Sequence, residues 1–79
     1  MISCQFSLYP LGIEQLGPVI DNALVALQAP GLEIETGPMS TMVLGETAAV
    51  FAALERAFVA ASGEGPVVMT VTLSNACPV

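Results

Sequence analysis

The chain has 79 residues, of which 54% are hydrophobic and only 10% are charged. A chain of this length has material for one domain with one hydrophobic core. Seven acids stand against a single base, Arg56, which excludes the basic surface that nucleic-acid binding requires. Because so few charged residues cannot cover the surface of a monomer, we expect apolar surface to be buried between identical copies.

The sequence shows no pattern of a targeting or membrane-spanning segment. It opens on a strand-like stretch rather than on a basic and then apolar leader. No run reaches the roughly 18 apolar residues of a membrane span, so we expect no membrane insertion and a cytoplasmic location. In that compartment Cys4 and Cys77 are expected to be reduced. Their spacing matches no zinc motif, and we predict neither a metal site nor a cofactor.

The first predicted elements are a strand over residues 2–9 and a helix that begins at about Leu16. In the strand, apolar and more polar residues alternate, which is typical of a strand with two different faces. Its apolar set is Ile2, Cys4, Phe6 and Leu8. In the helix, Pro18 falls in the first turn, where proline is tolerated, and a Pro-Gly pair at 30–31 closes it. The predicted core stripe of this helix is Leu16, Ile20, Ala23, Leu24 and Leu27.

A hairpin and a last strand show the same alternation. Residues 32–36 and 39–44 flank a Gly-Pro pair, which predicts two strands joined by a turn. After a second Gly-Pro pair, residues 67–74 alternate again and predict an amphipathic strand.

A second helix is predicted between these segments. It begins at Glu46 or Thr47 and ends at Ser62, with Gly63 as its C′ residue. Its predicted core stripe is Val50, Phe51, Leu54, Phe58 and Ala61. Alanines fill much of its remaining surface, which indicates either close approach of another element or simply high helix propensity.

The order of these elements predicts an α+β, ferredoxin-like βαββαβ fold. Two right-handed crossovers and a central hairpin give a four-stranded antiparallel sheet of order 4-1-3-2, with both helices on one face. The uncovered face is expected to be rich in hydroxyl and amide groups, from Ser3, Gln5, Ser7, Thr70, Thr72 and Ser74. Such a face is suited to stacking on a second sheet, so we predict a homodimer or homotetramer that forms through sheet faces.

The residue types favour binding over catalysis. Histidine is absent, and neither cysteine has a basic neighbour in the sequence that would lower its thiol pKa. Glu33 and Glu35 share one strand face, where a solvated edge is far more common than acid–base catalysis. No glycine-rich phosphate loop precedes either helix. We therefore predict that the protein is not an enzyme.

Four polar residues on neighbouring strands form the strongest candidate site. Gln5 and Ser7 lie on the first strand, and Ser40 and Thr41 lie on the third, its expected neighbour. Amide and hydroxyl groups in an otherwise apolar cleft orient a flat heterocycle through hydrogen bonds. The alternative, which composition alone favours, is that these groups pair across a subunit interface.

Three segments of the chain resemble a known family. They are QFSLYPLG (residues 5–12) at the first strand, GPMSTMVLGE (residues 37–46) in the hairpin, and VTLSNACP (residues 71–78), which covers the second half of the last strand and the residues that follow it. In these segments the chain is similar to the YkoF-like proteins that bind thiamine and hydroxymethylpyrimidine, and to a broader group of small thiamine-binding domains. The resemblance implies one ferredoxin-like domain over residues 1–79, whose sheet packs against the sheet of a second domain. Here that second sheet would belong to another subunit.

The resemblance also implies roles for single residues. Four would hydrogen-bond an aminopyrimidine: Gln5, Ser7, Ser40 and Thr41. Two would flank its ring: Tyr9 and Met39. Three are candidates to meet the polar or cationic end of the ligand: Asp21, Asn22 and Glu46. A carboxylate near a thiazolium gains from charge attraction in a partly dry pocket.

Two functions remain open at the level of the sequence. The first is a small-molecule binding protein for thiamine or its hydroxymethylpyrimidine moiety, in salvage, transport or buffering of the vitamin. The alternative is a structural or regulatory interaction domain that assembles through its open sheet face with no ligand. Cys4 and Cys77 fall where the first and last strands meet, but cytoplasmic reduction argues against a disulfide between them.

Overall fold

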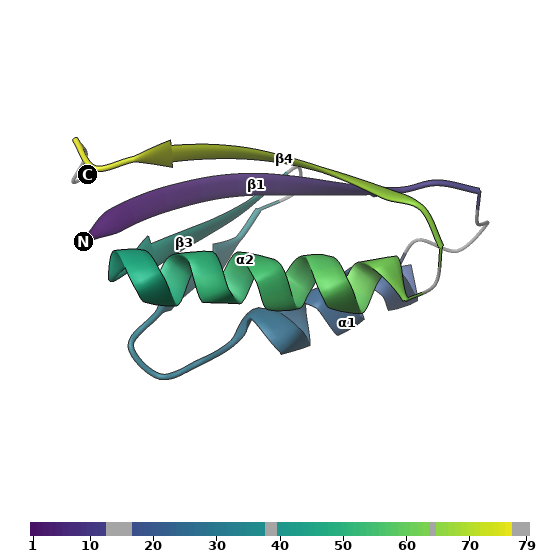
Figure 1. The fold of residues 1–79 in the computed structure, drawn as a ribbon, viewed down its shortest axis with the longest axis horizontal. Coiled ribbons are helices and arrows are strands. Elements are labelled where there is room, and N and C mark those ends of the chain that lie inside the picture. Colours follow the sequence, from purple (N-terminus) through teal and green to yellow (C-terminus); the bar gives the residue numbers. More distant parts are fainter. Residues whose placement is uncertain (13–16, 38–39, 64, 77–79) are drawn as a thin grey trace.

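The six elements follow the predicted order. The computed structural model describes residues 1–12, 17–37, 40–63 and 65–76. Along the chain the elements are β1 (Ile2–Pro10), α1 (Gly17–Leu27), β2 (Glu33–Thr36), β3 (Thr41–Gly45), α2 (Thr47–Ser62) and β4 (Val67–Ser74). The strands form one antiparallel sheet in the order β2-β3-β1-β4, and both helices lie on the same face of it (Figure 1). The predicted ferredoxin-like fold and its strand order are confirmed.

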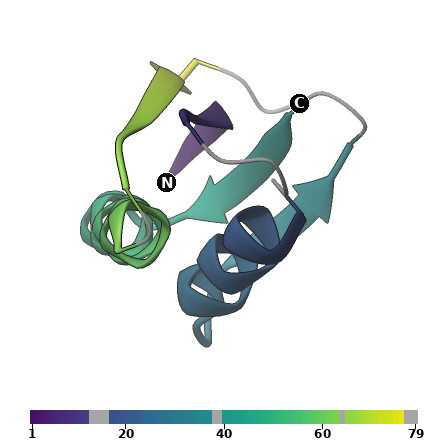
Figure 2. The same ribbon diagram turned by 90° about the vertical axis from the view of Figure 1, so that its right-hand side faces the viewer.

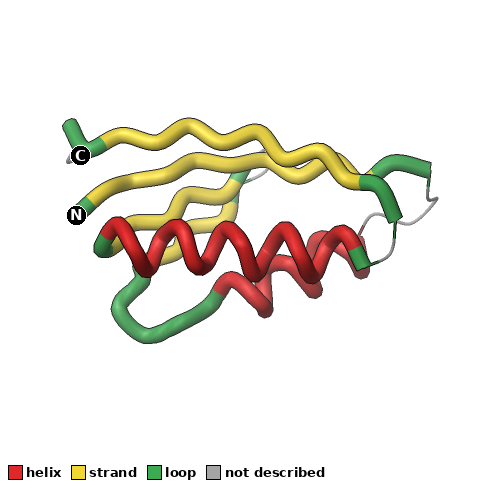
Figure 3. Tube along the Cα trace, viewed as in Figure 1, coloured by secondary structure: helices red, strands yellow, loops and turns green. Residues whose placement is uncertain are grey.

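The molecule has two layers. Figure 3 shows the strands in one layer and the helices in the other. Seen end-on, α2 lies beneath the β4–β1 side of the sheet and α1 beneath the β3–β2 side (Figure 2). The opposite face of the sheet carries no element among the described residues, and we call it the open face.

Cross-strand pairing sorts the side chains into the two faces. Cys4 pairs with Val43, and both are almost fully buried, so this strand phase faces the helices. Directly opposed residues share a face. Gln5, one residue further on, pairs with Met42 on β3 and with Thr72 on β4, and this phase forms the open face. The predicted alternation of β1 is therefore confirmed.

The face that α1 turns to the core differs slightly from the prediction. The predicted Ala23 and Leu27 are fully buried, and Val19, which was not predicted, is buried beside them. Ile20 and Leu24 are half-buried at the margin of this face. The core of the molecule therefore reaches α1 through Val19 rather than Ile20.

The face that α2 turns to the core is formed by smaller residues than predicted. The buried residues are Val50, Ala53, Leu54, Ala57 and Ala61. The predictions for Phe51 and Phe58 are wrong, because these side chains are 51% and 40% exposed. Ala53 and Ala57 are fully buried instead. Small buried side chains allow a neighbouring element to pack closely against α2.

The ends of α2 also differ in detail. Thr47 is the first helical residue, and Glu46 occupies the N-cap position without a side-chain capping hydrogen bond. Gly63, predicted as the C′ residue, is instead the C-cap and has a right-handed φ of −64°. The glycine that takes a positive φ after the helix is Gly65, at 139°. This conformation disfavours a side chain and turns the chain towards β4.

Arg56, the single base, connects the two helices. Its Nε donates to the carbonyl oxygen of Ala26 at 2.8 Å, and its Nη2 donates to that of Leu27 at 3.1 Å. The last carbonyls of a helix have no partner within it and carry the negative end of the helix dipole. The guanidinium on α2 therefore satisfies and neutralises the C-terminal end of α1.

Replacing Arg56 by methionine will destabilise the fold, because Arg56→Met keeps the apolar stem but leaves both carbonyls without this partner. We expect the free energy of unfolding to fall by about 1.5–3 kcal/mol, the usual range for hydrogen bonds to a charged group. Arg56→Lys should lose less, since it keeps the charge but not the two-pronged geometry. Urea denaturation of the wild type and of both variants gives their free energies of unfolding. An equal free energy of unfolding for wild type and Arg56→Met would contradict this role.

Cys4 gives the core a pH dependence. It is 1% exposed and free, and burial raises the pKa of its thiol above the ordinary value of 9.0. The folded state therefore holds this proton more tightly than the unfolded state, so its contribution to stability is complete below about pH 9 and is lost above it. From pH 8 to 10, roughly the range of thiol titration, wild type should lose stability more steeply than Cys4→Ala. Denaturation at several pH values measures both slopes, and parallel slopes would refute the assignment.

Candidate functional site

β1 extends past β3 and leaves a gap in the sheet. It pairs with β3 only over Ile2–Phe6, but with β4 over Ser3–Pro10. From Ser7 onward, no described strand lies beside β1 on the β3 side. The end of the β2–β3 hairpin and one side of α1 border this gap and enclose a pocket of about 100 Å³. We call this pocket the notch.

The walls of the notch are mainly apolar. Phe6 and Leu8 contribute from β1, and Ile20 and Leu24 contribute from α1. Ile20 and Leu24 are only half-buried, and the exposed parts of their side chains line the notch. A pocket with such walls covers the faces of a flat ring and excludes water from them.

Hydroxyl groups from three strands meet at this pocket. Ser7 lines it from β1, Thr36 from the end of β2, Thr41 from the start of β3, and Ser40 from the position just before β3. The hairpin that holds Ser40 is closed by a hydrogen bond from the backbone N–H of Gly37 to the Ser40 carbonyl oxygen, at 2.8 Å. The notch therefore combines apolar walls with a few convergent polar groups.

Gln5 lies next to the notch and orients one of its hydroxyls. Its Nε2 donates to the Oγ of Ser40 at 2.9 Å. This bond connects β1 to the hairpin on the open face, where Gln5 is exposed. Gln5 is thus coupled to the notch through Ser40 rather than lining it.

Thr41 is the most buried polar residue of the site. Its side chain is 7% exposed and lines the notch, and it pairs with Phe6 in the phase that faces the helices. Its hydroxyl makes no hydrogen bond to any residue that the structure describes. No fully buried side-chain oxygen among those residues lacks a partner, so the Thr41 oxygen is not fully buried.

Of the residues predicted for the site, the structure gathers Ser7, Ser40 and Thr41 in the notch, with Gln5 beside them.

The other predicted residues that the structure describes lie elsewhere. Tyr9 is exposed two residues beyond Ser7 and does not line the notch. Two more are exposed on α1, on the helix side of the sheet: Asp21 and Asn22. Glu46 follows Gly45, which pairs with Ile2, so it lies at the opposite end of β1. Met39 and Cys77, like Leu16, lie outside the described residues.

Sequence reasoning missed the apolar half of the notch. Ile20 and Leu24 were assigned to the core stripe of α1, and Phe6 and Leu8 to the core phase of β1. Phe6, Leu8 and Leu24 do contact the core, whereas Ile20 does not belong to it. None of these assignments showed where β3 would end beside β1. The available signal was the length difference between the first strand and the hairpin strands.

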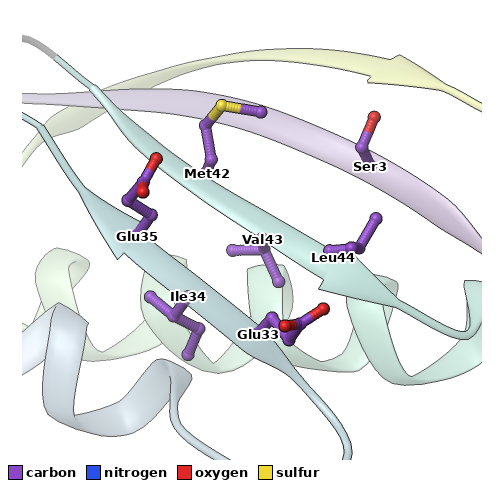
Figure 4. A pocket seen from close by; sticks show the side chains of 7 residues that line it. All are labelled: Ser3, Glu33, Ile34, Glu35, Met42, Val43 and Leu44. Atoms are coloured by element: carbon purple, nitrogen blue, oxygen red, sulfur yellow. The ribbon is translucent and has the colours of Figure 1, made fainter. Parts of the chain in front are cut away.

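A second hollow, of about 340 Å³, lies on the open face over β2 and β3 (Figure 4). Met42 and Leu44 lie along it, between Glu33 and Glu35 on one side and Ser3 on the other. The two carboxylates are exposed, as the prediction of a solvated edge requires. No polar group here is as buried as Thr41, so this hollow has less means to fix the orientation of a ligand.

The described residues hold no cluster of three or more carboxylate or thiol side chains that would bind a metal ion. Neither described helix is long and apolar enough to cross a membrane. The lining of the notch, as far as it is described, contains no titratable side chain. The site therefore offers hydrogen bonds and apolar contact.

Comparison with known proteins agrees with this architecture. A model of the YKOF-related family matches residues 1–79. The chain belongs to the YKOF-related family. None of the curated proteins matches the sequence.

Solved structures with the same fold are also known. A DUF77 domain of unknown function from Bacillus cereus is 25% identical with a TM-score of 0.81, over 92% of this chain and 73% of that one. The hypothetical protein MJ1052 of Methanocaldococcus jannascii is 20% identical with a TM-score of 0.86, over 94% and 78%. A candidate thiamine biosynthesis/salvage protein of Thermotoga maritima, TM0486, is 20% identical with a TM-score of 0.79, over 91% and 80%.

Proposed function

We propose that this member of the YKOF-related family binds the aminopyrimidine ring of thiamine or of hydroxymethylpyrimidine in the notch, for salvage, transport or buffering of the vitamin. The observation that carries the proposal is Thr41, a residue only 7% exposed that lines the notch and whose hydroxyl has no hydrogen-bond partner among the described residues. Its oxygen is not fully buried, so water reaches it when no ligand is bound. A ligand that donates to or accepts from this hydroxyl replaces that water.

The chemistry of the notch suits an aminopyrimidine. Such a ring presents an amine that donates and ring nitrogens that accept, and serine and threonine hydroxyls do both. The aliphatic and aromatic walls cover the faces of the ring. A volume of about 100 Å³ is well below the roughly 300 Å³ of sites that enclose drug-sized ligands, so one ring enters and the rest of thiamine stays outside.

The comparisons support the same ligand class. Family membership extends over the whole chain, and one protein of the same fold is a candidate for thiamine biosynthesis or salvage. The proposal is binding without chemistry, because the described lining of the notch supplies no acid or base that would move a proton.

The open face supports a second candidate function, assembly without a ligand. Met42 and Val68 are 44% and 47% exposed on this face among polar side chains, and such a mixture suits a sheet-to-sheet contact between copies. Binding and assembly through this face are compatible. If neither ligand binds, assembly alone remains as the function of the open face.

The exchange Thr41→Val tests the binding proposal, because it removes the hydroxyl and keeps the shape of the side chain. Isothermal titration should show that wild type binds thiamine and hydroxymethylpyrimidine with similar affinity, since the ring makes the contacts. Thr41→Val should bind both about 3- to 10-fold more weakly, the effect of one neutral hydrogen bond. Its thermal stability should equal or exceed that of wild type.

The matched control is Thr72→Val, the same exchange on an exposed position of β4 away from the notch. It should bind like wild type. Absence of heat and of thermal shift with both ligands at millimolar concentration would refute the function. Equal affinity of Thr41→Val and wild type would place the site outside the notch.

A further inference from the structure

The hydrogen bond between Gln5 and Ser40 has a direction. A glutamine amide donates through its nitrogen and accepts through its oxygen, whereas a serine hydroxyl does both. Here the nitrogen Nε2 of Gln5 meets the Oγ of Ser40, at 2.9 Å. Because an amide nitrogen is a donor only, the proton of the Ser40 hydroxyl does not point back at Gln5. This proton remains free for another acceptor.

The notch is where that proton becomes available. The bond to Gln5 is the one hydrogen bond that the Ser40 hydroxyl makes to the residues that the structure describes. Ser40 lines the notch, whereas Gln5 lies outside it, exposed on the open face. Gln5 therefore occupies the oxygen of this hydroxyl from outside the pocket and leaves its proton for a ligand inside.

The bond from Gln5 also makes Ser40 a better donor than acceptor. Hydrogen bonds in a chain polarise one another, so a hydroxyl that accepts a bond donates its own proton more strongly. Thr41 differs, because no described residue fixes the direction of its hydroxyl. It can donate to a ligand or accept from one. Of these two hydroxyls, Ser40 is the one that gives the notch a fixed polarity.

We propose that Gln5 is a positioning residue, which makes Ser40 donate to a ring nitrogen of the ligand and so selects an aminopyrimidine over its oxo analogue. This inference rests on the proposed function and adds the group that discriminates between rings. In the aminopyrimidine, the ring nitrogen beside the amine is an acceptor. In the oxo analogue a carbonyl replaces the amine, and this nitrogen carries a proton. Two donors then face each other, and a site built for one pattern rejects the other.

The exchange Gln5→Glu tests the inference, because it keeps the shape of the side chain and replaces the donor by a carboxylate that only accepts. The carboxylate takes the Ser40 proton and leaves lone pairs towards the notch. Isothermal titration compares hydroxymethylpyrimidine with its oxo analogue, in a buffer basic enough to keep both rings uncharged. Wild type should bind the amino form about 5- to 150-fold more tightly, the effect of one unpaired polar group. Gln5→Glu should bind the oxo form more tightly.

Two controls separate the hydrogen bond from the added charge. Thr72 pairs with Gln5 on the open face but lies on the other side of β1 from Ser40. Thr72→Glu therefore brings the same charge to the same region and should keep the wild-type preference. Ser40→Ala removes the group through which Gln5 acts. Adding Gln5→Glu to Ser40→Ala should leave the ratio of the two affinities unchanged, which a merely structural role of Gln5 does not require.

The outcomes distinguish this inference from the proposed function. If wild type binds hydroxymethylpyrimidine and Gln5→Glu keeps the wild-type preference, the inference is overturned and the proposed function stands. A reversed preference in Thr72→Glu, or one that Gln5→Glu produces without Ser40, would assign the effect to charge and also overturn the inference. Binding of neither ring by wild type would refute the proposed function and this inference together.

Discussion

The site depends on one constraint, which is that β1 has nine residues and β3 has five. Over their shared length the two strands close the sheet, and Cys4, Phe6 and Val43 anchor it on the helices. Beyond Phe6, β4 is the only described strand that pairs with β1, and Ile20 and Leu24 of α1 line the resulting opening. The notch is this opening, so its walls come from the core and its rim comes from the hairpin.

The fold was predictable because its strands alternate with a period of two, and four such segments around two helices leave few topologies. The helix faces were less predictable. Hydrophobicity placed Phe51 and Phe58 in the core, but the face that α2 turns to the core carries the smaller Ala53 and Ala57 instead. Small residues decide how near two helices come, and the sequence alone does not show which alanines meet a neighbour.

Of the polar residues that line the notch, the sequence pointed to Ser7, Ser40 and Thr41 but not to Thr36, and it did not show the geometry. Ser40 and Thr41 were grouped as neighbours, yet adjacent positions on an extended chain point to opposite faces. Ser40 bonds to Gln5 on the open face, whereas Thr41 is buried on the helix side, and only the gap beside Ser7 lets both border one pocket. Where β3 ends relative to β1 is a matter of register, which composition does not determine.

The central claim is that the notch, rather than the larger hollow on the open face, receives the pyrimidine ring. Titration of isotope-labelled protein with hydroxymethylpyrimidine, followed by two-dimensional NMR, tests this claim most directly. The account predicts that the largest chemical-shift changes occur at Ser7, Leu24, Ser40 and Thr41. Changes centred on Glu33, Met42 and Leu44, with the notch residues unaffected, would contradict it.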